Sequence, residues 1–546
     1  MRVPMLLAGL LLAAAPLAAR PQAAPGEPRF SAAEIRKHVT FLADDRLAGR
    51  DAGTPGHELA ARYVAEQFAA LGLRPGGTDK GWFQQVSLAE YGLDDRRPAS
   101  LRVGPHKFAN GAEVLIAPSP RFGTATQTVT GGAVFVGYGL EAPDLGYDDY
   151  AGLDLRGKFA VMLIGVPKGL PAATAARINR ERGVTAAKHG AAGILYIAGP
   201  ADQRQWRYAA GYMLDDTTKW LSEQGFPDGI DPGVQIGAYL NETAAKALFQ
   251  GAGMRIEQIF AAAASSGRLK GFALKQRATL ERTSKVKAYR SPNVIGVLPG
   301  SDPALADQYV VLSAHLDHVG RDSHLPGDKI HNGAMDNAAG VATMLEAARA
   351  FAQGKTRPKR SILFVALTAE EDGLLGSSYL ARHPVTGRGR LVADVNLDMP
   401  ILLYDFQDVI AFGGEHSTMG EIVARAGARM GVAVSPDPVP EEQFFERSDH
   451  FNFVKAGVPS IFLMTGFANG GEKAFRDFLA NNYHQVSDQI DLPFNWDAGA
   501  KFARLNYLIA REVADSPEAP RWYAGNPFGD RYAPNAPRAP RPAKTN

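Results

Sequence analysis

The chain has 546 residues, a length that favours about two to four domains over a single one. The 59 Lys and Arg nearly balance the 57 Asp and Glu, and a formal net charge of +2 gives no electrostatic reason to expect a nucleic-acid partner. The sequence contains no cysteine, which excludes disulfides, thiolate metal ligands and a cysteine nucleophile. Any metal site has to use nitrogen and oxygen ligands.

The first residues are typical of an export signal. Arg2 precedes the apolar stretch 5–15, and small residues follow as far as Ala24. We therefore predict a signal peptide over residues 1–24 and a periplasmic or secreted protein. Because no other stretch approaches the roughly 20 apolar residues of a membrane-spanning helix, we expect no transmembrane anchor.

Two segments of different character follow the signal. Ser31 and Glu34 have the spacing of a capping box, and apolar residues recur at helical spacing before Gly72, so the beginning of segment 30–99 is expected to be helical. From about residue 100 to 280 the pattern changes to short β-rich runs between Gly, Asp and Pro residues. This second segment is predicted to be a separate α+β module.

From about residue 285 to 515, predicted strands alternate with amphipathic helices. The strands fall at 308–314, 361–367, 391–397 and 459–464, and the helices at 337–352, 417–430 and 497–514. This alternation predicts an α/β fold with a mixed, mostly parallel central sheet flanked by helices. The last segment, 516–546, is rich in Pro, Arg and Ala and is expected to be a disordered tail.

Histidines and carboxylates occur mainly near the ends of the predicted strands. The carboxyl ends of such strands meet at one edge of a sheet, so residues far apart in sequence are expected to converge there. Two histidines and three carboxylates without sulfur suit Zn²⁺, with Mn²⁺ or Co²⁺ also possible. The histidines and carboxylates at these positions, from which the five ligands would be drawn, are His315, Asp317, Asp336, Glu370, Glu371, Asp398 and His484.

The spacing of these residues predicts different roles. On a strand, Asp317 lies on the same side as His315, so its carboxylate can accept a hydrogen bond from the ring nitrogen that faces away from a metal. Glu370 and Glu371 point in opposite directions on an extended segment, so one can bind a metal while the other acts on water. If Asp336 bridges two cations about 3.5–4 Å apart, a water between them becomes more acidic and a substrate carbonyl is polarised. The pattern therefore predicts amide hydrolysis.

Six motifs carry a resemblance to a known family. They occur in the order SAHLDHVG, HNGAMDNAAG, LTAEEDGLLGS, VNLDMP, RSDHFNF and YHQVSD. The set resembles the co-catalytic di-zinc aminopeptidase family, which includes bacterial leucine aminopeptidases and glutamate carboxypeptidase. The resemblance implies a zinc exopeptidase domain formed by 281–515 together with 30–99. Segment 100–280 resembles a protease-associated domain, on the pieces DYAGLDLRGKFAVML and KHGAAGILYI, and would be an insert.

The resemblance also implies the metal ligands. His315 and Asp398 would hold one zinc ion, Glu371 and His484 would hold the other, and Asp336 would bridge the two. The expected cofactor is accordingly two Zn²⁺ ions.

Further residues receive catalytic and binding roles from the same resemblance. Glu370 would be the general base, and Tyr483 would donate its hydroxyl to the oxyanion formed on attack. Arg447 and His450 would line the substrate pocket. The nearby residues His318, His324 and His331 are expected to form a polar loop at the mouth of the site.

We therefore predict an exported zinc metallopeptidase that removes N-terminal residues from peptide substrates. The same metal centre also suits a carboxypeptidase or dipeptidase, and a one-zinc glutaminyl cyclase relative would keep the fold. The alternative from another class is a non-catalytic peptide-binding protein on the peptidase fold, which the presence of every ligand and of the base argues against. Pro400, shortly after Asp398, constrains the next loop, so a preference for large apolar residues does not follow. The pattern does not distinguish oligomeric states.

Overall fold

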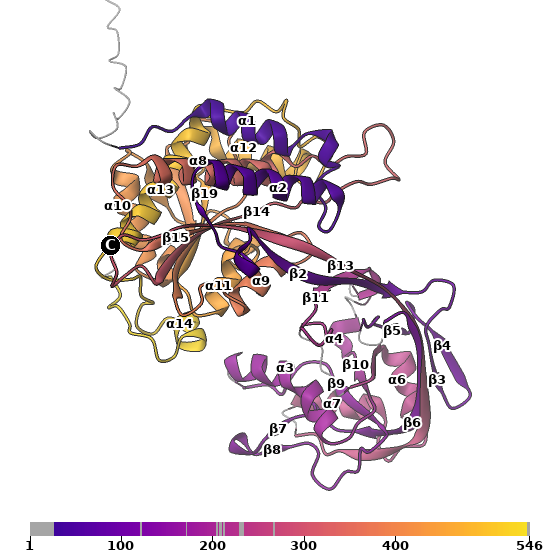
Figure 1. Cartoon of the computed structure of the whole chain (residues 1–546). Helices are drawn as coiled ribbons and strands as arrows, with labels where there is room; N and C mark the ends of the chain where they lie inside the picture. The colour runs from indigo at the N-terminus through magenta and orange to yellow at the C-terminus, as the bar shows by residue number, and fades with distance from the viewer. Residues whose placement is uncertain are drawn as a thin grey trace, which may run out of the picture. The chain divides into compact units, whose positions relative to one another are not determined.

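The computed structural model describes residues 27–120, 123–170, 172–203, 206, 210, 213–228, 234–265 and 268–542. The predicted signal peptide, residues 1–24, lies outside the described residues. The chain forms two compact units: the first comprises Met1–Gln84, Asn293–Glu370 and Leu380–Asn546, and the second comprises Gln85–Pro292 and Glu371–Tyr379 (Figure 1). Within the described ranges, no helix combines the length and the apolar character needed to cross a bilayer.

The first unit is built on one mixed sheet. Its parallel strands are, in spatial order, β15 (Ser361–Leu367), β14 (Gln308–His315), β16 (Arg390–Leu397) and β19 (Ser460–Thr465). The last residues of β13 (Phe272–Leu298) run antiparallel to β15, and β17 (Asp408–Phe412) runs antiparallel to β19. The short strands β1 (Arg74–Pro75) and β18 (Ala433–Ser435) pair with β13 and β17. The predicted mixed, mostly parallel sheet is confirmed.

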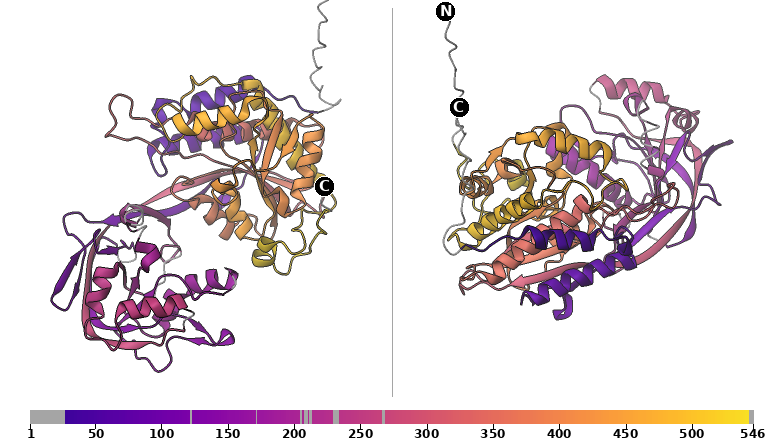
Figure 2. Two further views of the ribbon diagram at one scale, coloured as in Figure 1. Left: turned by 180° about the vertical axis from the view of Figure 1, so that it is seen from behind. Right: turned by 90° about the horizontal axis from the view of Figure 1, so that it is seen from above.

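Helices cover both faces of this sheet, which explains the continuous apolar runs of its strands. Val310 and Leu312 of β14 pack into the larger core, whereas Val311 packs on the other face with Phe453 of α11 (Figure 1). The N-terminal helices lie beside C-terminal helices on one face (Figure 2). The helices that contribute to the larger core are α1 (Ala32–Leu42), α2 (Pro55–Ala70), α8 (Gly340–Gln353), α10 (Met419–Ala428), α12 (Gly471–Asn481) and α13 (Trp496–Asp515); α11 spans His450–Lys455.

The predicted elements of this unit agree closely with the structure. Strand β15 coincides with the prediction at 361–367, and the predicted bounds of β14, β16 and β19 are within about one residue of those observed. Helix α8 begins later than predicted, at Gly340, because Asp336 and Asn337 have non-helical backbone angles inside the irregular turn Ala334–Ala339. This turn carries Asp336, one of the predicted metal ligands.

The second unit has its own core and its own set of strands. Its parallel strands are β6 (Ala125–Phe135), β9 (Phe159–Leu163), β10 (Gly193–Ile197) and β12 (Ile236–Leu240), and β5 (Val114–Ile116) is antiparallel to β12. The first part of β13 pairs with β6 and with β3 (Ser100–Val103), and β4 (His106–Ala109) pairs with β3. Strand β2 (Phe83–Leu93) pairs with β11 (Thr217–Trp220). The helices are α3 (Ala172–Lys188), the short α4 (Pro200–Gln203), α6 (Glu242–Leu248) and α7 (Ile256–Ser265).

The expectation of a disordered tail over 516–546 is wrong for the part that the structure describes. Trp522 and Tyr523 are only 2% and 4% exposed, and α14 (Pro527–Tyr532) follows them. The content of Pro, Arg and Ala concealed these aromatic residues, which supply the apolar surface that an ordered segment needs. We call residues 516–542 the C-terminal strap.

Candidate metal centre

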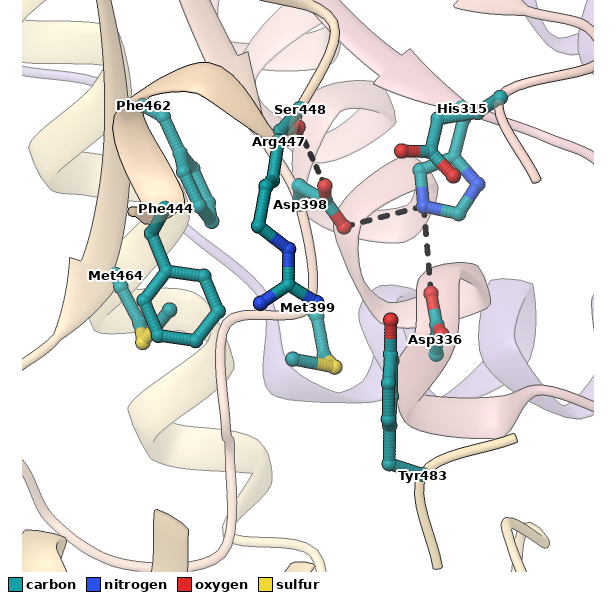
Figure 3. A pocket seen from close by; sticks show the side chains of 11 residues that line it. His315, Asp336, Asp398, Met399, Phe444, Arg447, Ser448, Phe462, Met464 and Tyr483 are labelled. Carbon is teal, nitrogen blue, oxygen red and sulfur yellow. Dashed lines mark hydrogen bonds and ion pairs between the residues drawn. The ribbon is translucent and has the colours of Figure 1, made fainter. Parts of the chain in front are cut away.

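His315 is the last residue of β14, and it is 1% exposed. Its Nε2 atom lies 3.1 Å from Oδ1 of Asp398 and 3.3 Å from Oδ1 of Asp336 (Figure 3). Its Nδ1 atom lies 3.2 Å from the backbone carbonyl oxygen of Asp317. A proton on Nδ1 that is donated to this carbonyl leaves the Nε2 lone pair facing the carboxylates, as a metal ligand requires.

The contacts of Asp317 differ from the predicted ones. The prediction pairs its carboxylate with His315, but the backbone carbonyl makes this contact, and carboxylate Oδ1 accepts the backbone N–H of Glu370 at 3.1 Å. Asp317 therefore links the end of β14 to the segment after β15. It fixes the backbone of the predicted base as well as the ring of the predicted ligand.

Asp336 is oriented by a clamp on its own backbone. The N–H groups of Met335 and Asp336 donate to the two carboxylate oxygens of Asp488, at 2.8 and 3.0 Å. The Asp336 side chain is 4% exposed, and its Oδ2 lies 3.2 Å from Nε2 of His484. Since Oδ1 faces His315, one buried carboxylate contacts two histidines through its two oxygens. This is the arrangement expected of a bridging ligand.

A second group of candidate donors adjoins the first. One donor atom from each of His318, Asp336, Glu371 and His484 lies within 4.8 Å of the others. Glu371 begins the short segment that belongs to the second unit, but a peptide bond joins it directly to Glu370 of the first. The predicted ligands thus fall into two adjoining groups that share Asp336.

His318 lies on a loop, as expected, but this loop is buried at His318. The residue is 1% exposed, its Nδ1 is 3.9 Å from Oδ2 of Asp336, and its ring meets that of His484 edge to face at 5.6 Å. His331 is also buried, at 9% exposure, whereas His324 is exposed. His318 is therefore close enough to the candidate ligands to be a donor itself, a role that the prediction did not give it. Room for the His318 ring comes from Gly333, where a Cβ would lie 2.5 Å from Cδ2 of that ring.

Asp398 is held by a buried chain of hydrogen bonds that the sequence reasoning did not identify. The hydroxyl of Ser448 donates to Oδ2 of Asp398 at 2.5 Å, and the Asn396 side chain donates to Ser448 Oγ at 2.7 Å. Ser313 extends this chain, because its Oγ lies 3.1 Å from Oδ1 of Asn396 and 2.8 Å from Oδ1 of Asp394. Ser448 belongs to the RSDH stretch, where only Arg447 and His450 were assigned roles.

Arg50 is another residue that the sequence reasoning missed. It is 1% exposed, and its guanidinium donates to the backbone carbonyls of Leu316 at 2.9 Å, Asn332 at 2.5 Å and Gly333 at 3.0 Å. These carbonyls belong to the segments that carry His315 and Asp336. No residue pattern marks such a site, because the acceptors are backbone atoms that every sequence has.

The centre lies in a strongly negative field. Burial alone would lower the pKa of His315, but the charges of Asp398 and Glu370 and hydrogen bonds to carboxylates outweigh it and raise this pKa well above its ordinary value. Burial would raise the pKa of Asp336, but hydrogen bonds with His315 and His484 hold it well below its usual range. Burial raises the pKa of Asp488 to about 7, against its backbone hydrogen bonds. Such a field favours bound cations.

An open cavity adjoins this centre (Figure 3). Glu370 and Tyr483 line it beside the metal-ligand candidates, and the Tyr483 ring stacks on His484 at 3.9 Å. Arg447 also lines it and forms an ion pair with Glu442 at 3.1 Å. The remaining wall is largely apolar and contains Met399, Phe444, Phe462 and Met464.

His450 does not line this cavity. It is 0% exposed, and its ring lies 5.3 Å from that of Phe445 and 5.6 Å from that of Phe462. Burial lowers the pKa of His450 to about 3, so the ring is neutral. Its position behind the wall excludes direct contact with a substrate in this conformation and corrects its predicted role.

The sheet and the two donor groups at the carboxyl ends of its strands define a domain of the zinc metallopeptidase class. Residues 293–510 match the family model described as Peptidase family M28. The match covers about two fifths of the chain, and it bears out the resemblance to a zinc aminopeptidase family that the six motifs indicated.

Named relatives agree with this class. The chain is 28% identical over 239 residues to "Leucine aminopeptidase 1" of Neurospora crassa, which covers 42% of this chain and 55% of the relative. It is 26% identical over 296 residues to "Aminopeptidase NAALADL1" of Mus musculus, an alignment that covers 46% of this chain and 36% of the relative. A "Probable zinc metalloprotease" of Pyrenophora teres f. teres is 41% identical over 109 residues, which cover 19% of this chain and 22% of the relative. The chain spans between about a fifth and about half of these curated relatives.

Similar solved structures include an aminopeptidase from Aneurinibacillus sp. strain AM-1. That structure is 22% identical, with 90% of this chain and 95% of that chain covered and a TM-score of 0.48. A zinc aminopeptidase from Bacillus subtilis is 18% identical, with 90% and 97% covered and a TM-score of 0.42.

The buried guanidinium of Arg50 supports a first prediction. Arg50→Gln leaves backbone carbonyls without donors, so we expect the free energy of unfolding to fall by roughly 2–4 kcal/mol. Calorimetric or denaturant unfolding measures this change. Arg46→Gln, at an exposed ion pair with Asp44, is the matched control and should leave stability unchanged. Equal effects of both substitutions would contradict the role given to Arg50.

Proposed function

We propose that the chain is an exported exopeptidase that removes N-terminal residues from peptides and works with two divalent ions, zinc by preference. The observation that carries this proposal is the position of Asp336. Its two oxygens lie 3.3 Å from His315 and 3.2 Å from His484, and each histidine adjoins a further carboxylate. Both the sharing of one carboxylate and the nitrogen and oxygen donors fit a pair of zinc ions.

In this proposal the ligands divide as the resemblance implies. His315 and Asp398 would hold one ion, Glu371 and His484 would hold the other, and Asp336 would be shared between them. When bound, such ions lower the pKa of a water molecule and polarise the carbonyl of the scissile bond. Hydrogen bonds within the protein keep these donors in position without a metal. Ser448 donates to Asp398, Asp488 accepts from the backbone beside Asp336, and the carbonyl of Asp317 contacts the ring of His315.

Glu370 is the proposed general base. It lines the cavity, and one of its donor atoms lies within 4.8 Å of those of His315 and Glu371. The hydrogen bond from its backbone N–H to Asp317 fixes the segment from which its side chain extends. The carboxylate takes a proton from the attacking water and passes it to the departing amine.

Tyr483 is proposed to stabilise the developing oxyanion. Its hydroxyl points into the cavity on the side of Asp336 and His315 (Figure 3). Stacking on His484 limits the freedom of the ring, so the donor is already oriented when negative charge develops on the substrate oxygen.

The charge around the cavity favours recognition of a free amine. A substrate ammonium group is attracted by Glu370 and the other carboxylates, while the charge of Arg447 is partly neutralised by Glu442. The apolar side chains Met399, Phe444, Phe462 and Met464 are placed to contact the first side chain of a peptide. Recognition of a free carboxylate, as in a carboxypeptidase or dipeptidase, is the second candidate and is supported by the presence of Arg447 itself.

The experiment that tests the function compares blocked and free substrates. We expect the purified chain to release the amine from aminoacyl anilides and to cleave C-blocked dipeptides, but not N-blocked ones, because the free ammonium is bound by the carboxylates. Hydrolysis is followed by absorbance and by chromatography. Cleavage of N-blocked peptides alone would support the carboxypeptidase reading, and no cleavage with two ions bound would support a peptide-binding protein.

The proposed base can be tested separately from the metal. Glu370→Gln should reduce kcat by about 10²–10⁴-fold, because the amide cannot accept the proton, while metal content stays unchanged. Steady-state kinetics and metal analysis of the same preparation measure both. Loss of metal in this variant would make Glu370 a ligand instead.

The bridging role makes a third prediction. Wild-type protein should hold two equivalents of zinc, His484→Ala should hold one tightly, and Asp336→Asn should weaken both sites because it alters the shared ligand. Metal analysis after dialysis gives the stoichiometry. His324→Ala, which changes an exposed histidine of the same region, is the control and should hold two. Retention of two ions in Asp336→Asn would contradict the bridge.

A further inference from the structure

The C-terminal strap is joined to the first unit by backbone pairing. Trp522 forms an antiparallel bridge with Ser417, and the N–H of Tyr523 donates to the carbonyl of His416 at 3.1 Å. Thr418 and Arg521 also contact each other through backbone hydrogen bonding at 3.0 Å. The strap therefore has a defined register against this unit.

Two aromatic residues of the strap pack against α11 and the segment before it. Trp522 is 2% exposed, its Nε1 donates to the carbonyl of Gly457 at 3.0 Å, and its ring packs with Phe451 and Val454. Phe528, in α14, has its ring centroid 5.1 Å from that of Phe445 and 6.0 Å from that of Phe451. Figure 1 shows α14 beside α11.

The segment in contact with the strap is also a wall of the substrate cavity. We define this pocket wall as residues 444–448. Phe444, Arg447 and Ser448 line the cavity, whereas Phe445 packs into the aromatic cluster with Phe528. Neighbouring residues of one short segment thus contact the cavity on one side and the strap on the other.

The pocket wall has little regular structure of its own. It consists of one short 3-10 turn, Phe444–Glu446, followed by Arg447 and Ser448, and Asp449 then precedes α11. On the inner side Gly413 has φ +91°, and a Cβ there would lie 2.6 Å from Cε2 of Phe445. Side-chain packing, with Gly413 on one side of Phe445 and Phe528 on another, therefore determines where the wall lies.

We infer that the strap positions the pocket wall, and that Phe528 and Trp522 are positioning residues for the binding of the first substrate side chain. The inference rests on the proposed function. Phe528 lies outside the cavity lining, so it acts through Phe445 on Phe444 and Arg447. The proposed base and metal ligands come from other segments, and Ser448, the one wall residue that contacts a proposed ligand, is also bonded to Asn396 and Asp398, so binding should change more than chemistry.

Phe528→Ala in the full chain tests this inference. KM for an aminoacyl anilide with a large apolar side chain should rise by about 5- to 20-fold, on the scale of apolar pocket contacts, with kcat within about 2-fold. Phe528→Leu should restore most of the loss, because it keeps apolar volume against Phe445. Phe30→Ala is the matched control: Phe30 is also half-buried and packs edge to face on Tyr507, on another part of the unit.

A second measurement does not depend on activity. In Phe528→Ala, amide hydrogen exchange should accelerate by about 10-fold or more over residues 440–455 and stay unchanged over β14. Unchanged exchange and unchanged KM would overturn the inference, as would equal changes in Phe30→Ala. If the wild type cleaves no aminoacyl substrate, the proposed function fails, while the exchange experiment still decides whether the strap positions the wall.

Discussion

The structure is dominated by one electrostatic constraint, the gathering of several carboxylates around two histidines in a largely buried space. Carboxylates that approach one another away from water repel strongly unless cations or hydrogen-bond donors lie between them. The protein supplies part of this compensation: Ser448 donates to Asp398, and His315 and His484 contact Asp336. Divalent ions would supply the rest, so metal binding is expected to be coupled to the order of the site.

The rest of the first unit keeps these groups in position. The parallel strands deliver His315, Glu370 and Asp398 to one edge, and the turn before α8 adds Asp336. Two buried ionisable residues then hold the backbone of the ligand segments: Asp488 accepts from N–H groups of the turn, and Arg50 donates to the carbonyls of Asn332 and Gly333 just before it. Because Asp488 is acidic, it accepts hydrogen bonds from backbone N–H groups, and because Arg50 is basic, it donates hydrogen bonds to backbone carbonyls. The N-terminal segment is thus part of the site as well as of the core.

The sequence predicted the parallel strands of the first unit, most of its helices and the candidate donor residues that the structure brings together, because buried parallel strands are apolar throughout and metal ligands belong to few residue types. It did not predict the contacts that depend on backbone atoms. The carbonyl of Asp317 and the acceptors of Arg50 leave no mark in the residue pattern. Composition also led to the wrong prediction of disorder at the C-terminus, because the buried Trp522 orders a segment that is otherwise rich in Pro and Arg. The burial of His318 depends on space beside Gly333, which requires coordinates.

The RSDH stretch shows why a motif at a site need not contact the substrate with every residue. Arg447 and Ser448 face the cavity and Asp398, but His450 is neutral and enclosed by Phe445 and Phe462. His450 therefore belongs to the packing that supports the pocket wall from behind, the same layer in which Phe528 lies. A substitution in this layer changes the shape of the cavity without removing any group from it. In the proposed peptidase, selectivity for the first side chain would accordingly change through residues of the strap while the chemistry at Glu370 stays the same.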